Sequence, residues 1–171
     1  KREKDAPIRM KENVWRGYTN RLWRTDPDAA CIRRRETVFR KQRLERHEIL
    51  NFGYFEDEEA FTVLANQYVS GGNICLCERM AELDEDRRAM YRSVIPSIET
   101  PAKILKPHNP ECPNYFLTEV TPKAEGLDPW WTLAVTNWTS EPVMEQIDLS
   151  LVKLPEGVDR VAVFEYFQQR Y

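Results

Sequence analysis

Apolar and polar residues follow two different patterns along the chain, and the change falls near residue 100. In the first part, the short apolar runs AACI (29–32) and NICLC (73–77) are typical of buried strands. Each run is followed by a segment, 57–70 or 84–95, in which apolar residues recur at helical spacing. The order strand, helix, strand, helix predicts βα units with parallel strands.

Both predicted helices carry start and stop signals. The segment 57–70 begins with acidic residues, which suit a helix N-terminus, and ends at Gly71-Gly72. Its predicted apolar face consists of Ala60, Phe61, Leu64 and Tyr68. The second helix is expected to start at Asp84 and to stop before Pro96. Its predicted inward stripe consists of Leu83, Met90, Tyr91, Val94 and Ile95.

The remainder of the chain has the pattern of an all-β region. Seven prolines between residues 96 and 129 indicate connections and edge strands. The segments 114–120, 130–138, 143–151 and 160–167 alternate or are rich in β-branched and aromatic residues, with turn signals between the last three. We therefore expect an antiparallel β-sandwich over residues 101–171.

The first part raises a physical difficulty. Two βα units supply only two parallel strands, whereas a parallel sheet needs more strands and cover on both faces. We therefore expect residues 1–100 to be the C-terminal part of a larger α/β domain, completed by polypeptide outside this sequence.

The composition argues against several classes of binding partner. The 25 basic and 28 acidic residues give a net charge of −3, and no basic aromatic-rich stretch predicts nucleic-acid binding. Apolar runs are too short for a membrane span, so we expect a soluble protein of unassigned compartment. The four cysteines do not have the spacing of a zinc site, and Cys75 and Cys77 are interpreted as buried free thiols. No metal or organic cofactor is predicted.

The order of the motifs resembles a known family. Trp23-Arg24-Thr25-Asp26-Pro27-Asp28, then the segment 70–80 (SGGNICLCERM) and a helix over 83–95, are similar to the closing part of the catalytic barrel of α-galactosidase-type glycoside hydrolases (clan D, families 27 and 36). In that family, Trp-Asn-Asp-Pro-Asp ends barrel strand seven, and the eighth strand has an acidic end. The segment LAVTNWTSEPVMEQIDLSL also resembles the family's C-terminal β-domain.

The resemblance implies a fold and an activity. The fold would be the last two βα units of a (β/α)8 TIM barrel (residues 1–100) followed by a C-terminal antiparallel β-sandwich (101–171). The activity would be retaining hydrolysis of α-galactosides or related α-glycosides, which needs two carboxylates about 5 Å apart. In the family both lie upstream of this segment, so no catalytic residue is expected in this chain. A missing N-terminal part or a partner chain would supply them, and a homo-oligomer is also compatible with the sequence.

Four residues are the candidate substrate-binding set: Asp28, Trp23, Asp26 and Glu78. By the resemblance, Asp28 accepts hydrogen bonds from sugar hydroxyls. Trp23 either offers a flat face to a pyranose ring or is a core aromatic. Asp26 is expected to brace the loop or to pair with Arg24. Glu78 follows the second strand and either lines the pocket or forms an ion pair with Arg79 or with a neighbouring loop. Tyr18 and Arg21 are weaker candidates.

The sequence leaves one alternative class open. The chain departs from the family at Thr25, where the family has Asn, and at the long basic insert 33–56. A non-enzymatic carbohydrate-binding or interaction module accounts for the same residues without a catalytic pair.

Overall fold

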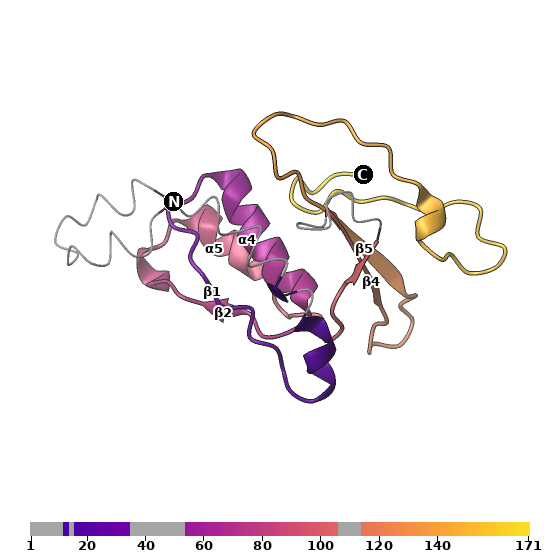
Figure 1. The fold of residues 1–171 in the computed structure, drawn as a ribbon, viewed down its shortest axis with the longest axis horizontal. Coiled ribbons are helices and arrows are strands. Elements are labelled where there is room, and N and C mark those ends of the chain that lie inside the picture. Colours follow the sequence, from indigo (N-terminus) through magenta and orange to yellow (C-terminus); the bar gives the residue numbers. More distant parts are fainter. Residues whose placement is uncertain (1–11, 14–15, 35–53, 106–113) are drawn as a thin grey trace.

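The computed structural model describes residues 12–13, 16–34, 54–105 and 114–171. Two small sheets lie on either side of helix α4 (Figure 1). The elements in chain order are η1 (Arg16–Arg21), β1 (Ala29–Ala30), α4 (Asp57–Ser70), β2 (Cys75–Leu76), η2 (Met80–Glu82), α5 (Glu85–Ser93), β3 (Lys103–Ile104), β4 (Tyr115–Val120), β5 (Trp130–Val135) and η3 (Leu149–Leu151).

The first sheet consists of β1 and β2, which are parallel neighbours. Ala29 pairs with Cys75 and Ala30 with Leu76, and α4 lies between the two strands in sequence. This confirms the predicted parallel pairing, although each strand has only two residues. The (β/α)8 barrel stays a prediction, because the described residues show a two-stranded parallel sheet and no barrel.

Helix α4 begins and ends at the signals that the sequence carries. Glu56 and Glu59 form a capping box at its N-terminus, where each carboxylate accepts a backbone N–H. At its C-terminus Gly71 has φ 66°, and a Cβ there would lie 2.4 Å from the backbone nitrogen of Pro101. Only glycine fits this close left-handed turn.

The two helices and the first sheet share one apolar core. Ala60 and Leu64 of α4 are buried, while Phe61 and Tyr68 are half-buried against the same cluster. From the second helical segment, Leu83, Met90, Tyr91 and Val94 are buried as predicted. Ile95 is 51% exposed, so its predicted place in the inward stripe is wrong. It lies beyond the end of α5 at Ser93, where the helical period no longer applies.

The second sheet is antiparallel, in the order β3-β4-β5. Strands β4 and β5 pair along all six residues, from Tyr115–Val135 to Val120–Trp130. Phe116 of β4, Val69 of α4 and Ala102 form a second buried cluster. The division at residue 100 stays a prediction, and this cluster joins residues from both sides of it.

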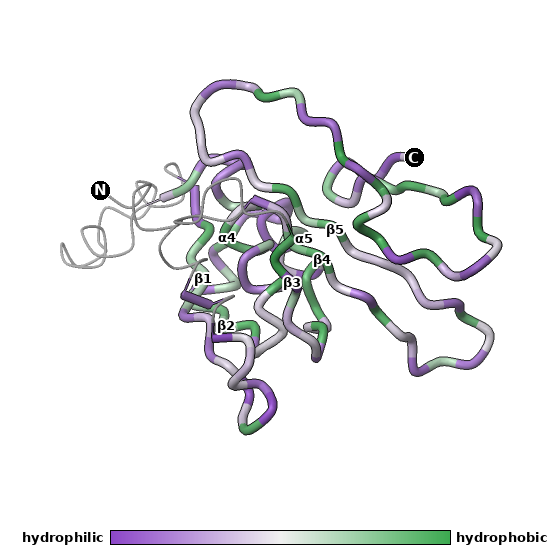
Figure 2. Tube along the Cα trace, turned by 45° about the vertical axis from the view of Figure 1, so that its right-hand side comes forward, coloured by the Kyte–Doolittle hydropathy of each residue, from purple (hydrophilic) through white to green (hydrophobic). Residues whose placement is uncertain are grey.

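Two predicted strands do not form. Residues 143–148 are irregular and are followed by η3, and residues 160–164 are irregular before a tight Glu165–Arg170 bridge. The Asp148 carboxylate accepts the Ser150 N–H at 2.9 Å, and the Glu165 carboxylate accepts the Gln168 N–H at 2.5 Å. Such local bonds compete with strand pairing. Figure 2 shows this C-terminal segment as long loops of mixed hydropathy. The second sheet of a sandwich is therefore not seen in the described part of the chain.

Candidate functional site

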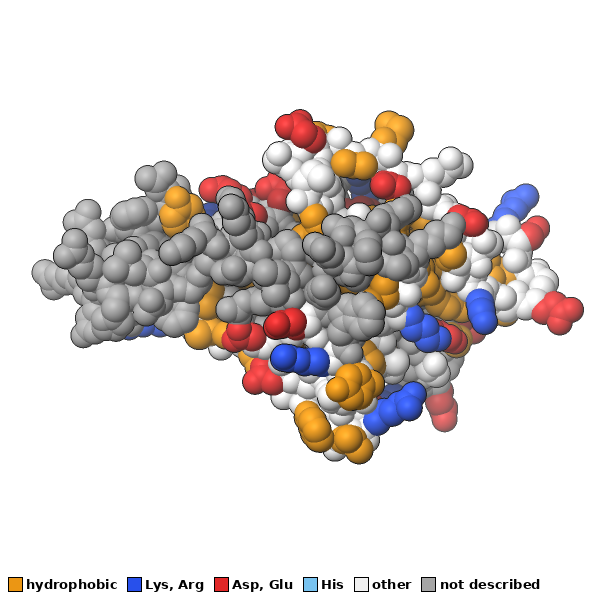
Figure 3. Space-filling model, in the orientation of Figure 1, with side chains coloured by type: hydrophobic (Ala, Val, Ile, Leu, Met, Phe, Trp, Pro, Cys, Tyr) orange, Lys and Arg blue, Asp and Glu red, His pale blue; other side chains and the backbone are white. Residues whose placement is uncertain are grey.

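Trp23 stands on a turn that projects from the molecule. The backbone N–H groups of Leu22 and Trp23 both donate to the Thr19 carbonyl, at 2.9 and 3.0 Å. This turn leaves the Trp23 side chain 62% exposed, with Tyr18 and Leu22 also exposed nearby. Apolar side chains gather where this turn lies, at the bottom of the view in Figure 3, with basic side chains beside them. Trp23 is therefore exposed, and its alternative interpretation as a core aromatic is wrong.

The Asp-Pro-Asp loop, residues 22–28, is held by the buried residue Thr25. Its N–H donates to Asn20 Oδ1 at 2.6 Å, and its carbonyl accepts the Asn73 N–H at 2.9 Å. A Cβ on Gly72 would lie 2.1 Å from that carbonyl oxygen, so Gly72 permits the contact. The residue that departs from the glycoside hydrolase pattern is thus the anchor of the loop.

Asp26 and Asp28 are exposed but oriented by their own backbone. Asp26 Oδ1 accepts the Asp28 N–H at 2.9 Å and the Cys75 thiol at 3.3 Å. Asp28 has φ 71°, and its Oδ1 accepts the Ala29 N–H at 2.7 Å. The buried Gln67 amide donates to the Asp28 carbonyl at 2.6 Å. The expectation that Asp26 braces the loop is confirmed, whereas Arg24 instead pairs with Glu99.

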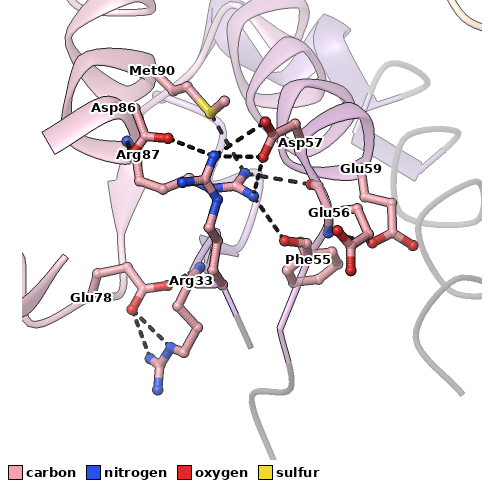
Figure 4. A network of polar contacts seen from close by, with 10 residues as sticks. Arg33, Phe55, Glu56, Asp57, Glu59, Glu78, Asp86, Arg87 and Met90 are labelled. Atoms are coloured by element: carbon pink, nitrogen blue, oxygen red, sulfur yellow. Dashed lines mark hydrogen bonds and ion pairs between the residues drawn. The ribbon is translucent and has the colours of Figure 1, made fainter. Parts of the chain in front are cut away.

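Glu78 lies at the other end of the sheet and does not face solvent. One of its oxygens accepts the backbone N–H groups of Ile32 and Arg33, at 2.8 and 3.2 Å. The other accepts from the Arg33 guanidinium at 2.8 and 2.9 Å, and the carboxylate side chain is 4% exposed. Figure 4 shows this pair. The structure therefore favours the ion-pair interpretation of Glu78, with Arg33 as the partner.

The predicted site is divided between the two ends of the first sheet. Trp23, Asp26 and Asp28 precede β1, whereas Glu78 follows β2. β1 begins at Ala29, within the predicted strand run 29–32, so Asp28 precedes its strand and does not end it as the resemblance implies. The two strands are parallel, so the Asp-Pro-Asp loop lies at the amino ends and Glu78 at the carboxyl ends. Barrel enzymes carry their chemistry at the carboxyl ends.

A charged network lies near the N-termini of α4 and α5, and the sequence did not predict it. Arg87, which is fully buried, donates to Asp57 at 2.7 Å and to the Phe55 carbonyl at 2.9 Å. Arg34 donates to both oxygens of Asp57 and also pairs with Asp86. Figure 4 shows that these side chains meet between α4 and α5. The acidic first turns were visible in the sequence, but their partners were not.

The electrostatics of this network follow from its geometry. The hydrogen bond from Arg34 lowers the pKa of Asp57, and the nearby positive charge of Arg87 acts in the same direction. Burial lowers the pKa of Arg87, because it disfavours the charged guanidinium. The contacts that cause these shifts join α4 to α5, and Asp57 and Asp86 stay about half exposed while Arg87 is buried.

The described residues hold no cluster of three or more His, Cys, Asp or Glu side chains suited to a metal ion. In the same part of the chain, no helix has the length and apolar character that a membrane crossing requires. Comparison with known protein families, with curated proteins and with solved structures finds no match for this chain. The resemblance to glycoside hydrolases thus stays a prediction from the residues.

Proposed function

We propose that this chain binds carbohydrate through the Asp-Pro-Asp loop. The observation that carries the proposal is the 62% exposed Trp23 on a loop that also presents the carboxylates of Asp26 and Asp28. An exposed indole offers an apolar plane to the C–H face of a pyranose ring. Carboxylates accept short, directional hydrogen bonds from sugar hydroxyls. This chemistry is common to both function classes that the sequence leaves open.

The structure supports a loop that is ordered before any ligand arrives. Thr25 ties the loop to Asn20 and Asn73, and Gln67 ties the Asp28 carbonyl to α4. A loop held in this way loses little conformational entropy on binding. This advantage matters for sugars, because their hydroxyls give up hydrogen bonds to water when they form hydrogen bonds to the protein.

The test is a glycan array probed with the 171-residue chain, followed by calorimetric titration of a retained α-galactosyl oligosaccharide. We expect Trp23→Ala and Asp28→Asn to weaken binding by about tenfold each, equivalent to about 1.4 kcal/mol. Trp130→Ala is the matched control, since Trp130 is also exposed (44%) but lies on β5. The proposal fails when no glycan is retained, or when Trp23→Ala and Trp130→Ala bind alike.

A second candidate is that the chain belongs to a retaining glycoside hydrolase that acts on α-galactosides or related α-glycosides. The order β1-α4-β2-α5 with parallel strands is consistent with part of a (β/α)8 barrel. The catalytic carboxylates would come from polypeptide outside these 171 residues. The Asp-Pro-Asp loop, at the amino ends of the strands, would then hold sugar away from the point of cleavage.

Hydrolysis is tested with this chain joined by the N-terminal part or the partner chain that the proposal requires. The substrate is nitrophenyl α-galactoside, and proton NMR identifies the first anomer released. A retaining enzyme releases the α-anomer first. The 171-residue chain alone is expected to release no nitrophenol. Lack of turnover in that assembly, with glycan binding intact, would leave the non-enzymatic binding module as the function.

A further inference from the structure

Cys31 and Cys77 each follow directly after a strand of the first sheet, β1 or β2, and lie close to each other. We propose that these two thiols form a reversible disulfide that links the first strand to the second when the protein meets a hydroperoxide. This inference is independent of the proposed carbohydrate binding, because it rests on the strand register and on the contacts of the two thiols.

The register brings the two cysteines opposite each other. The ladder pairs Ala29 with Cys75 and Ala30 with Leu76, so the same register, extended by one residue, places Cys31 opposite Cys77. The Cys77 N–H donates to the Ala30 carbonyl at 3.1 Å, and this bond holds the Cys77 backbone beside the end of β1. Neighbouring strands are about 4.8 Å apart, which lies within the Cα separations of about 4.4–6.8 Å that disulfides span.

The side chains are turned toward the same place. The Cys31 thiol donates to the Cys77 carbonyl at 3.5 Å, and the two thiols also interact directly. Cys75 is on the same face but is engaged differently, because its thiol donates to the Asp26 carboxylate at 3.3 Å. The geometry therefore selects Cys31 and Cys77 as the pair.

The two thiols differ in access to solvent. Cys31 is 6% exposed, whereas Cys77 is half-buried. Burial, with the nearby Glu78 charge as the next cause, raises the pKa of Cys31 to about 12. A thiol in that state is a poor first nucleophile at neutral pH. We therefore assign Cys77 as the thiol that meets the oxidant and Cys31 as the one that resolves it.

The chemistry balances in two steps. The Cys77 sulfur attacks one oxygen of the hydroperoxide, the O–O bond breaks, and Cys77 sulfenic acid forms with release of an alcohol or water. The Cys31 sulfur then attacks the Cys77 sulfur, and the S–O bond breaks. The hydroxide that leaves takes the Cys31 proton and departs as water. The peroxide is the two-electron oxidant, and an added dithiol reverses the bond.

The experiment is peptide mapping by mass spectrometry under non-reducing conditions, after treatment with hydrogen peroxide. Cys112→Ser is the background, because Cys112 lies outside the described residues and would add a further thiol. The expected product is a peptide pair joined through Cys31 and Cys77 that dithiothreitol separates. The melting temperature of the oxidised chain is expected to rise by about 5 °C or more, since the bond closes a long loop.

Two variants test the roles assigned to the cysteines. Cys31→Ser is expected to leave Cys77 as a sulfenic acid that dimedone traps, and Cys75→Ser is expected to leave the cross-link intact. A bond between Cys75 and Cys77, or peroxide treatment that leaves Cys31 and Cys77 both alkylatable, overturns the proposal. The mapping on the Cys112→Ser chain decides between these outcomes even where a further variant does not fold.

Discussion

The guanidinium of Arg87 donates to the Asp57 carboxylate at 2.7 Å, and this contact joins the N-terminal turns of α5 and α4. Arg87 has no exposed side-chain surface, whereas Asp57 is about half exposed and is also held by Arg34. The same guanidinium donates to the backbone carbonyls of Phe55 and Glu56. One buried side chain therefore holds the start of α4 against α5 (Figure 4).

Replacement of Arg87 is expected to destabilise the fold. Arg87→Met keeps most of the buried volume but leaves the Phe55 carbonyl without this donor, a loss of about 2–3 kcal/mol in the free energy of unfolding. Arg92→Ala is the matched control, because Arg92 lies on the same helix and is mostly exposed, and it should cost less than about 0.5 kcal/mol. Urea unfolding followed by circular dichroism measures both. Equal losses of unfolding free energy in the two variants would show that the buried contacts of Arg87 contribute no more to stability than the exposed contacts of Arg92.

The same network predicts an acid dependence. Because the pKa of Asp57 is lowered in the folded state, chiefly by the Arg34 hydrogen bond, its contribution is present above the unfolded carboxyl pKa of about 4. That contribution is lost as the pH falls through the lower folded value. Glu85 and Glu99, whose pKa values are also lowered by basic neighbours, add to the trend.

Asp57→Asn should therefore flatten, without abolishing, the fall in the free energy of unfolding below about pH 4. Arg34→Ala should move the Asp57 carboxyl pKa upward in a carbon-13 NMR titration of the folded chain. An unchanged pKa in that variant would assign the shift to another partner.

The close contact between Gly72 and Thr25 predicts that a side chain at position 72 disturbs the Asp-Pro-Asp loop. A Cβ at this position would lie 2.1 Å from the Thr25 carbonyl oxygen and 2.9 Å from its carbon, so the backbone must move. Gly72→Ala is expected to lower the free energy of unfolding by about 2–3 kcal/mol and to weaken sugar binding. The comparison is Gly126→Ala, where a Cβ meets nothing within 4 Å and only the positive φ of 82° is strained. That variant should cost about 1 kcal/mol and leave binding unchanged.

Structure is predicted best where the sequence signal lies within the segment itself. Helix α4 was predicted well because its acidic start and the Gly71-Gly72 end lie within the segment itself. The apolar run 29–32 contains β1 as predicted, but Asp28 precedes this strand, whereas the resemblance implies that it ends one. The segment 160–167 has the composition of a strand, but strand formation needs a partner edge, and the Glu165 carboxylate instead binds nearby backbone N–H groups.

The sequence pattern also does not predict ion pairs between residues that are far apart in the sequence. Arg33 belongs to a basic run that reads as a solvated face, yet its guanidinium is mostly buried against Glu78. Residues 35–53 of the basic insert lie outside the described residues. Burial and ion pairing at such positions depend on which strands become neighbours, and composition alone does not specify that.

Glu78 gives the prediction that best separates a structural role from a sugar-binding one. Its carboxylate accepts two backbone N–H groups and pairs with Arg33 at the carboxyl ends of the first sheet. Glu78→Gln retains an acceptor for the N–H groups but leaves the mostly buried Arg33 charge unpaired, which should cost about 2–4 kcal/mol of unfolding free energy. The affinity for a retained glycan, measured well below the melting temperature, should stay within about twofold of wild type, a difference below about 0.5 kcal/mol. Arg79→Ala, at an exposed neighbouring position, is the control and should cost less than about 0.5 kcal/mol of unfolding free energy with unchanged glycan affinity. Loss of glycan affinity with unchanged stability would reverse the assignment and return Glu78 to the substrate-binding set.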